Sequence, residues 1–220
     1  MGRLVERLAN AEPNESTLLN AVSELPRTMV NIRRAKKEDC EDLARLFLIS
    51  SDGFGEYMWK SVRRAGETFI EVGTRQFGRE CADISYENCL IAELDGASVG
   101  MAHSYLMKED PAAEPVCDPV ISACEMADYG SLYLLALAVL EPYRNGGIGT
   151  RLMRAVNQRA RDLAVQRISL ICYERNEAAM RFYARLGFQE VERRAVYPHP
   201  YLRYQDGDAV LLSREIRMSD

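Results

Sequence analysis

Three glycines and an arginine follow a strongly apolar stretch near residue 140, and this combination is suited to binding a phosphate group. Gly146, Gly147 and Gly149 carry no side chains at the point where a helix is expected to begin. The first N–H groups of a helix have no partner inside it, so a glycine-rich approach lets an anion come close to them. Arg144 adds a positive charge. The chemistry indicated for this segment is the binding of a phosphate or diphosphate.

Known phosphate motifs test this interpretation, because a strand followed by glycines is also ordinary turn chemistry. A dinucleotide fingerprint needs G-x-G-x-x-G, and a P-loop needs Lys followed by Ser or Thr after its last glycine. The run from Arg144 to Arg151 contains neither pattern. A nucleotide-binding oxidoreductase is therefore disfavoured.

A second candidate pair is Asn176 and Tyr183, which lie on a helix predicted over Asn176–Leu186. A helix turns about 100° per residue and rises about 1.5 Å, so positions 176 and 183 return to nearly the same face. A phenol has an ordinary pKa near 10 and can donate a proton at neutral pH. We expect the two side chains to face one site.

Both segments resemble signatures of the GCN5-related N-acetyltransferase (GNAT) family, which binds acetyl-coenzyme A (acetyl-CoA). The first resemblance covers Leu137–Val139, Pro142–Arg144 and the glycines; the second covers Asn176 and the Tyr183 that precedes Leu186-Gly187-Phe188. The order of predicted elements also matches this family from Ile32 to Ile216.

The resemblance implies a set of cofactor contacts. The pantetheine arm would pair with the main chain near Leu137 as an added strand, and the diphosphate would take N–H groups of the helix start. Arg144 or Arg151 would supply positive charge. The implied cofactor-binding residues are Leu137, Ala138, Val139, Arg144, Asn145, Gly146, Gly147, Ile148, Gly149, Thr150, Arg151, Asn176 and Tyr183.

The resemblance also implies catalytic roles. Tyr183 would return a proton to the thiolate of coenzyme A, and a backbone N–H near Leu137 would stabilise the oxyanion. Tyr133 stands where several relatives carry Glu or His. A tyrosine is a poor base unless its pKa falls, so a water relay from Tyr133, Glu93 or Glu125 stays open.

The acceptor site is expected between the first two helices of the domain, where the family usually places its substrate wall. Glu56, Tyr57 and Trp59 occupy this region, although core packing is the commoner role for a tryptophan. The long connection over residues 108–130 is rich in acids, including Glu125. Such carboxylates could draw an ammonium group toward the site.

The remaining pattern predicts an α/β fold with a mixed sheet of about six or seven strands flanked by helices. The resemblance to the GNAT family implies that this sheet is splayed at its centre, between Leu132–Leu140 and Arg167–Tyr173. Asp95-Gly96 predicts a two-residue hairpin turn, and Gly187 a left-handed helix end. Strands are predicted at Ile32–Ala35, Cys89–Glu93, Ala97–Met107, Leu132–Leu140, Arg167–Tyr173, Phe188–Arg194 and Ala209–Ile216. Helices are predicted from Lys37, over Glu56–Arg64, over Glu67–Arg79, from Ile148 and over Asn176–Leu186.

Composition bounds the function classes. The chain has 220 residues and a net charge of -5, which argues against nucleic acid as a partner. We expect a mobile extension over residues 1–28 and one domain over residues 29–220. No long apolar run or secretory signal stands out, so no membrane contact and a cytoplasmic location are expected. Two histidines and scattered cysteines predict no metal site.

These patterns together predict an acetyl-CoA-dependent N-acetyltransferase that transfers an acetyl group directly to a primary amine. The acceptor would be a small molecule or peptide, the acidic connection favours a cationic one, and the protein would be a monomer or homodimer. The alternative is a catalytically weak acyl-CoA-binding module with a regulatory or scaffold role. Its basis is the absence of a carboxylate at Tyr133.

Overall fold

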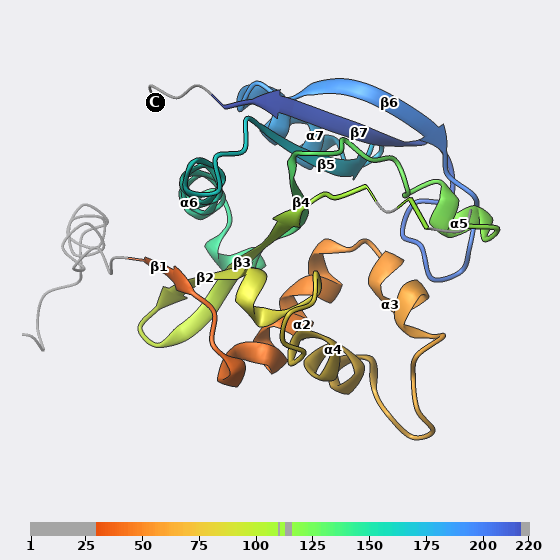
Figure 1. Ribbon diagram of the computed structural model, residues 1–220. Helices are drawn as coiled ribbons and strands as arrows, with labels where there is room; N and C mark the ends of the chain where they lie inside the picture. Colours follow the sequence, from red (N-terminus) through yellow and green to blue (C-terminus); the bar gives the residue numbers. More distant parts are fainter. Residues whose placement is uncertain (1–29, 110, 113–115, 217–220) are drawn as a thin grey trace, which may run out of the picture.

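A seven-stranded mixed sheet organises the molecule (Figure 1). The computed structural model describes residues 30–109, 111–112 and 116–216, so the extension expected over residues 1–28 lies outside the described residues. The strand order is β1-β2-β3-β4-β5-β7-β6, and only β4 and β5 pair in parallel. The strands are β1 (Asn31–Arg34), β2 (Cys89–Leu94), β3 (Ala97–Leu106), β4 (Leu132–Val139), β5 (Arg167–Tyr173), β6 (Gln189–Ala195) and β7 (Asp208–Glu215).

Helices cover both faces of the sheet. One apolar cluster joins α6 and α7 to one face, and two others join α2, α3, α4 and α5 to the opposite face. The α-helices are α2 (Cys40–Ser50), α3 (Phe54–Trp59), α4 (Phe69–Phe77), α5 (Pro119–Ser122), α6 (Ile148–Asp162) and α7 (Glu177–Arg185), and the short 3-10 turns are η1 (Lys37–Asp39), η2 (Tyr86–Asn88) and η3 (Glu141–Tyr143). The predicted α/β fold with a mixed sheet is confirmed.

The sheet opens at its centre, between β4 and β5. These strands pair only at Leu132↔Ile168 and Tyr133↔Ser169, where the buried hydroxyls of Ser131 and Ser169 are 2.6 Å apart. Beyond this point the backbone groups of β4 that face β5 lack a strand partner, and such groups need another partner or solvent. The predicted central splay is confirmed.

An irregular register in β4 accompanies the opening. His103 pairs with Ala136 and Ser104 with Leu134, so Leu135 is the extra residue of a β-bulge. Because a bulge shifts the side-chain alternation, Leu134 packs with the cluster under α6, whereas Ala136 packs with the cluster under α2. The bulge therefore lies just where the sheet begins to separate.

Local chemistry explains most helix and turn boundaries. Asp95 and Gly96 both have positive φ, 51° and 81°, as the predicted two-residue hairpin requires, and Gly187 has φ 84°. Helix α3 ends at Trp59, earlier than the predicted Arg64.

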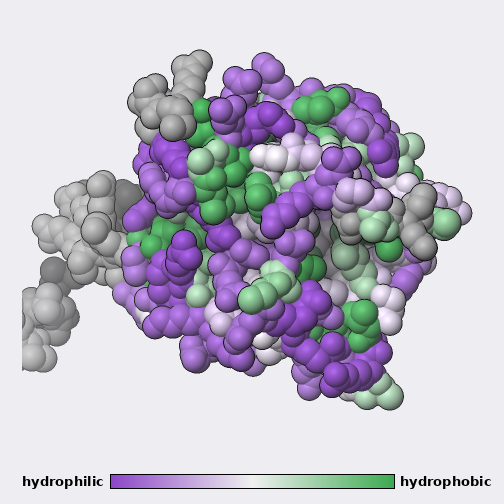
Figure 2. Space-filling view, in the orientation of Figure 1, coloured by the Kyte–Doolittle hydropathy of each residue, from purple (hydrophilic) through white to green (hydrophobic). Residues whose placement is uncertain are grey.

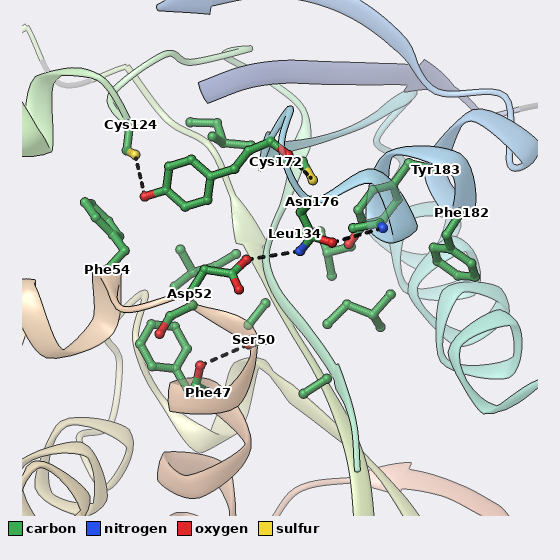
Figure 3. A pocket seen from close by; sticks show the side chains of 18 of the residues that line it. Phe47, Ser50, Asp52, Phe54, Cys124, Leu134, Cys172, Asn176, Phe182 and Tyr183 are labelled. Carbon is green, nitrogen blue, oxygen red and sulfur yellow. Dashed lines mark hydrogen bonds between the residues drawn. The ribbon is translucent and has the colours of Figure 1, made fainter. Parts of the chain in front are cut away.

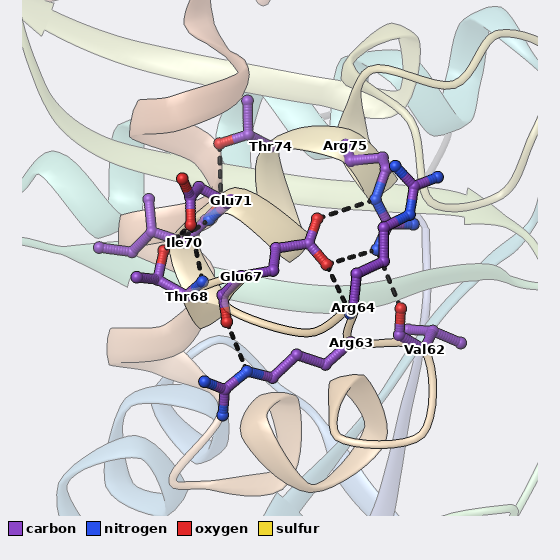
Figure 4. A network of polar contacts seen from close by, with 9 residues as sticks. All are labelled: Val62, Arg63, Arg64, Glu67, Thr68, Ile70, Glu71, Thr74 and Arg75. Carbon is purple, nitrogen blue, oxygen red and sulfur yellow. Dashed lines mark hydrogen bonds and ion pairs between the residues drawn. The ribbon is translucent and has the colours of Figure 1, made fainter.

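A polar network near the N-terminus of α4 accounts for this shorter helix (Figure 4). The Glu67 carboxylate accepts hydrogen bonds from the Arg64 backbone N–H at 2.9 Å and from the Arg75 guanidinium, and the Arg63 side chain donates to the Glu67 carbonyl. Thr68 and Glu71 form a capping box that starts α4. These contacts hold residues 60–68 as a turn instead of a helix.

The acidic connection over residues 108–130 is partly structural. Asp118 caps α5 and accepts a hydrogen bond from the Tyr57 hydroxyl at 2.6 Å. Asp128 binds the Arg167 guanidinium at 2.8 Å and the Ser213 hydroxyl at 2.7 Å. These two acids are therefore committed to contacts within the protein.

The surface drawn in Figure 2 is mostly hydrophilic, with small separate groups of apolar side chains. Within the described ranges, no helix has both the length and the apolar character that crossing a membrane needs.

Candidate active site

A cavity of about 1310 Å³ lies where β4 and β5 separate (Figure 3). Its lining comes from β4, the start of α6, the end of β5, α7, the α2–α3 loop and the 108–130 connection. The splayed sheet thus brings the two sequence signatures to one site, together with segments far away in the chain.

The start of α6 has the properties of an anion site. Its N-cap residue, Gly147, makes no side-chain cap, and its first turn carries no acid. By contrast, Thr68 caps α4 and Asn176 caps α7. The N–H groups of the first turn of α6 are therefore free of side-chain caps and suited to a diphosphate.

The backbone before α6 bends sharply to present these groups. Asn145 and Gly147 both adopt left-handed conformations, with φ 64° and 79°. A Cβ built on Gly149 would meet the Phe182 ring at 3.4 Å, so this glycine allows α6 and α7 to approach closely. The residues present fit the diphosphate of coenzyme A.

Most residues implied as cofactor contacts line this cavity, but two do not. Those that line it are Leu137, Ala138, Val139, Arg144, Asn145, Gly147, Ile148, Gly149, Thr150, Asn176 and Tyr183. Gly146 and Arg151 are absent from the lining, and the Arg151 guanidinium donates instead to the Val30 carbonyl. Of the two arginines considered for the charge, Arg144 is the one at the cavity, where its Nε donates to the Val139 carbonyl at 3.0 Å.

Tyr183 is packed as a neutral phenol. Its side chain is buried between aromatic neighbours, with ring centroids 5.4 Å from Phe182 and 5.5 Å from Phe188. Burial, and then the nearby Cys172, raise the pKa of Tyr183 above its ordinary value. The phenol therefore keeps its proton at neutral pH and is suited to proton donation rather than acceptance.

Tyr133 lines the cavity but is unsuited to act as a phenolate base. Its ring lies edge-on to Tyr105, with centroids 5.6 Å apart. Burial, followed by Tyr105, raises the pKa of Tyr133, which is the opposite of the shift that a base would need. Its hydroxyl can still orient an amine or a water molecule.

The two carboxylates considered for a relay are in different places. Glu93 does not line the cavity, because it lies at the end of β2 and pairs with Arg33 at 2.7 Å. Glu125 lines the cavity and is exposed. The described structure therefore keeps Glu125 at the site and corrects the expectation for Glu93.

The expected substrate wall on α3 does not line the cavity. Trp59 is 3% exposed and stacks on Phe47 with centroids 5.1 Å apart, while the Tyr57 hydroxyl bonds Asp118. Glu56 is half-buried. The expectation is therefore corrected: Trp59 packs in the core and Tyr57 binds the 108–130 connection, whereas Phe54 and Met58 of the same helix line the cavity.

Sequence reasoning missed Asp52, a carboxylate at the centre of the site (Figure 3). One oxygen accepts a hydrogen bond from the Asn176 amide at 3.0 Å, and the Asn176 Oδ1 accepts from the Ala179 N–H at 3.2 Å. Burial raises the pKa of Asp52, an effect that the Asn176 hydrogen bond and Arg203 oppose. The available signal was an acid before Gly53 at the end of a predicted helix, but its partner lies 124 positions away.

Comparison with known proteins identifies the family of this chain. The model of the acetyltransferase (GNAT) family matches residues 58–188. N-alpha-acetyltransferase 50 of Danio rerio is 36% identical over 87 residues, which are 39% of this chain and 50% of that protein. The chain therefore spans half the length of this curated relative.

Solved structures share the fold at low sequence identity. An N-acetyltransferase from Staphylococcus aureus Mu50 superposes with a TM-score of 0.58 and 18% identity, over 84% of this chain and 100% of that one. A Salmonella typhimurium protein, solved with its cofactor acetyl-CoA, gives a TM-score of 0.55 and 14% identity, over 87% and 96% of the two chains. The chain belongs to the acetyltransferase (GNAT) family.

Proposed function

We propose that this protein transfers an acetyl group from acetyl-CoA directly to a primary amine of a small molecule or peptide. One observation carries the proposal: a single cavity joins the uncapped start of α6, the open edge of β4 and the buried phenol of Tyr183. The start of α6 would supply an anion site, the open edge of β4 would supply main-chain groups, and Tyr183 would supply a proton donor.

The residues of the chain divide the work of binding. The N–H groups from Ile148 to Thr150 and the charge of Arg144 would hold the diphosphate. The main chain from Leu137 to Val139 would pair with the pantetheine amides as an added strand. Acetyl-CoA, when bound in this way, supplies an acyl group activated as a thioester.

The protonation states of the groups in the site are suited to the acylation of an amine. An acceptor ammonium must lose a proton before its nitrogen can react, and the departing sulfur must gain one. Tyr183 holds a proton at its phenol oxygen and can deliver it to the sulfur. A backbone N–H near Leu137, on the unpaired edge of β4, is suited to hydrogen-bond the acyl oxygen.

A panel experiment tests the proposal. Purified full-length protein is mixed with acetyl-CoA and single amines, namely spermidine, kanamycin, lysine methyl ester and short peptides with free amino termini. Peptides belong in the panel because relatives include N-alpha-acetyltransferases. Release of thiol together with a mass gain of one acetyl group on the amine is the expected result.

The panel also separates the alternative function. Tight coenzyme A binding without thiol release from any amine would favour an acyl-CoA-binding regulatory or scaffold module. Absence of coenzyme A binding would contradict both functions.

A further inference from the structure

The cavity contains one sequestered carboxylate. Three acidic residues line the cavity in the described part of the chain: Asp52, Glu125 and Glu177. Glu125 is exposed, and Glu177 pairs with Arg181 in solvent, with its side chain 76% exposed. The Asp52 side chain is only 9% exposed. A carboxylate removed from water in this way needs a donor or a positive charge to offset its desolvation.

The protein only partly meets that need. Asp52 Oδ2 accepts one hydrogen bond from the neutral Asn176 amide. Asp52 Oδ1 lies 3.7 Å from Arg203 Nη1, which is beyond hydrogen-bond length, and the Arg203 side chain is 71% exposed. An exposed guanidinium at this distance is a weak counterion because solvent screens it. Arg144, just before α6, also lowers the pKa of Asp52 through its charge, but burial has the larger effect and the net result is a raised pKa.

Asp52 is nevertheless held rigidly. It has φ 48°, and its carbonyl accepts a hydrogen bond from the Arg203 N–H at 2.8 Å. The next residue, Gly53, has φ 91°, and a Cβ there would overlap the Tyr201 carbonyl. The α2–α3 loop is thus fixed against the β6–β7 loop, so the carboxylate is presented to the cavity in one position.

Aromatic side chains share this part of the cavity. Phe54, Tyr173 and Tyr204 line it together with Asp52. The Tyr204 ring already lies 5.7 Å from the Arg203 guanidinium, whereas Phe54 and Tyr173 have no such cation contact in the described structure. Aromatic faces beside a carboxylate are suited to a cationic group, since both interact favourably with positive charge.

We propose that Asp52 is the residue that binds the ammonium group of the acceptor, and that the substrate class is therefore a primary amine presented as a cation. The substrate ammonium would supply a cation within hydrogen-bond distance of Asp52, which Arg203, at 3.7 Å, does not. Asn176 acts as a positioning residue, because its amide orients the carboxylate while its Oδ1 caps α7. This assignment rests on the proposed function, and it places the acceptor anchor at Asp52 and not at Glu125 or on α3.

Asp52→Asn is the sharpest test. Asparagine tolerates the left-handed conformation and can still accept the Asn176 hydrogen bond, so the variant removes charge with little change of shape. Each amine of the panel is titrated into protein saturated with coenzyme A, which measures acceptor binding without turnover. We expect Kd for the amine, and KM where turnover occurs, to rise at least about 10-fold, as for loss of a hydrogen bond to a charge.

Two controls separate charge recognition from general damage. Asp42→Asn removes the same charge from an exposed position of α2 and should leave amine and coenzyme A binding unchanged. On the ligand side, the form of the best amine in which every amino group is acetylated carries no positive charge. Wild-type protein should bind it at least about 10-fold more weakly than the free amine. This comparison needs no variant and therefore holds even if Asp52→Asn is unstable.

Several results would overturn the inference. They are unchanged amine affinity in Asp52→Asn, equal affinity for charged and acetylated ligands, a loss confined to Glu125→Gln, or no binding of any panel amine to the wild-type complex. Acetylation that is insensitive to Asp52→Asn would refute only this assignment. Asp52-dependent amine binding without any thiol release would instead refute the proposed function and leave the assignment standing.

Discussion

On the side of the cavity proposed for the cofactor, the lining comes from segments that are close in the chain, β4 with the start of α6 and then α7. On the side proposed for the acceptor, Asp52 meets Asn176 across 124 positions, and the β6–β7 loop packs on the α2–α3 loop. The two sides also differ in electrostatics: the first offers backbone N–H groups to an anion, and the second offers a carboxylate to a cation.

This difference has a physical cause. A diphosphate can be held by the main chain, so glycines and a helix start suffice, and both are local features. Recognition of an acceptor depends on side chains that loops from separate parts of the fold bring together. The cofactor side is therefore specified by short motifs, whereas the acceptor side is specified by tertiary packing.

The largest effect is expected at Tyr183, which serves the cofactor side. Tyr183→Phe keeps the ring contacts with Phe182 and Phe188 but removes the acidic hydroxyl. We expect kcat to fall about 10²- to 10⁴-fold, as for loss of a general acid. Coenzyme A affinity, measured by calorimetry, should change little. A fully active variant would exclude Tyr183 as the proton donor.

The next largest effect is expected at the start of α6. Gly147→Asp would place a negative charge beside the diphosphate, at a left-handed position that Asp and Asn tolerate better than most residues. We expect coenzyme A binding to weaken roughly 100-fold, because like charges in contact cost several kcal/mol. Gly147→Asn adds a side chain of the same shape without the charge and should lose less. The comparison between the two sides fails if amine affinity, titrated without coenzyme A, falls as much as coenzyme A affinity.

Asn176 belongs to both sides, so its replacement should affect both ligands. Asn176→Asp preserves the cap on α7 but replaces the hydrogen bond to Asp52 with a second carboxylate. We expect KM to rise about 10-fold for both the amine and acetyl-CoA.

Asn176→Ser is the matched control, because it keeps a capping oxygen and adds no charge. A smaller rise in KM for the amine is expected in this variant. If Asn176→Asp raised KM for only one of the two ligands, Asn176 would serve only the part of the cavity that binds that ligand.

The smallest effect on either site is expected from His103, which is part of the framework that both share. Burial lowers the pKa of His103 from 6.5 to about 4, and its Nε2 lies 2.8 Å from the Asp83 carbonyl. Between these two pH values the unfolded chain binds a proton that the folded protein does not. The free energy of unfolding therefore decreases as the pH is lowered.

Lowering the pH from 6.5 to 4 should therefore reduce the free energy of unfolding of the wild-type protein by a few kcal/mol, because His103 stays neutral in the folded state. His103→Gln has a similarly placed amide nitrogen that does not titrate, and urea unfolding at several pH values should give a flatter profile. At neutral pH both binding affinities should match those of the wild type. A selective loss of one ligand would show that His103 serves one side only.

The amino-acid sequence by itself determined the succession of strands and helices along the chain, the hairpin at Asp95-Gly96 and most of the residues of the proposed cofactor side. Those features depend on alternation, turn residues and helix starts, which are encoded within a few residues. The arrangement of β4 was less accessible, because the bulge at Leu135 becomes visible only through its register with β3.

Only the tertiary structure decided which polar residues reach the cavity. It brought Asp52 to Asn176, turned Trp59 into the core, and committed Glu93 to Arg33 and Arg151 to Val30. Burial also raised the pKa of Tyr133 and Tyr183, since desolvation depends on everything packed around a group. Short-range patterns fix backbone geometry, but the charge and contacts of a side chain depend on neighbours that the chain supplies from far away.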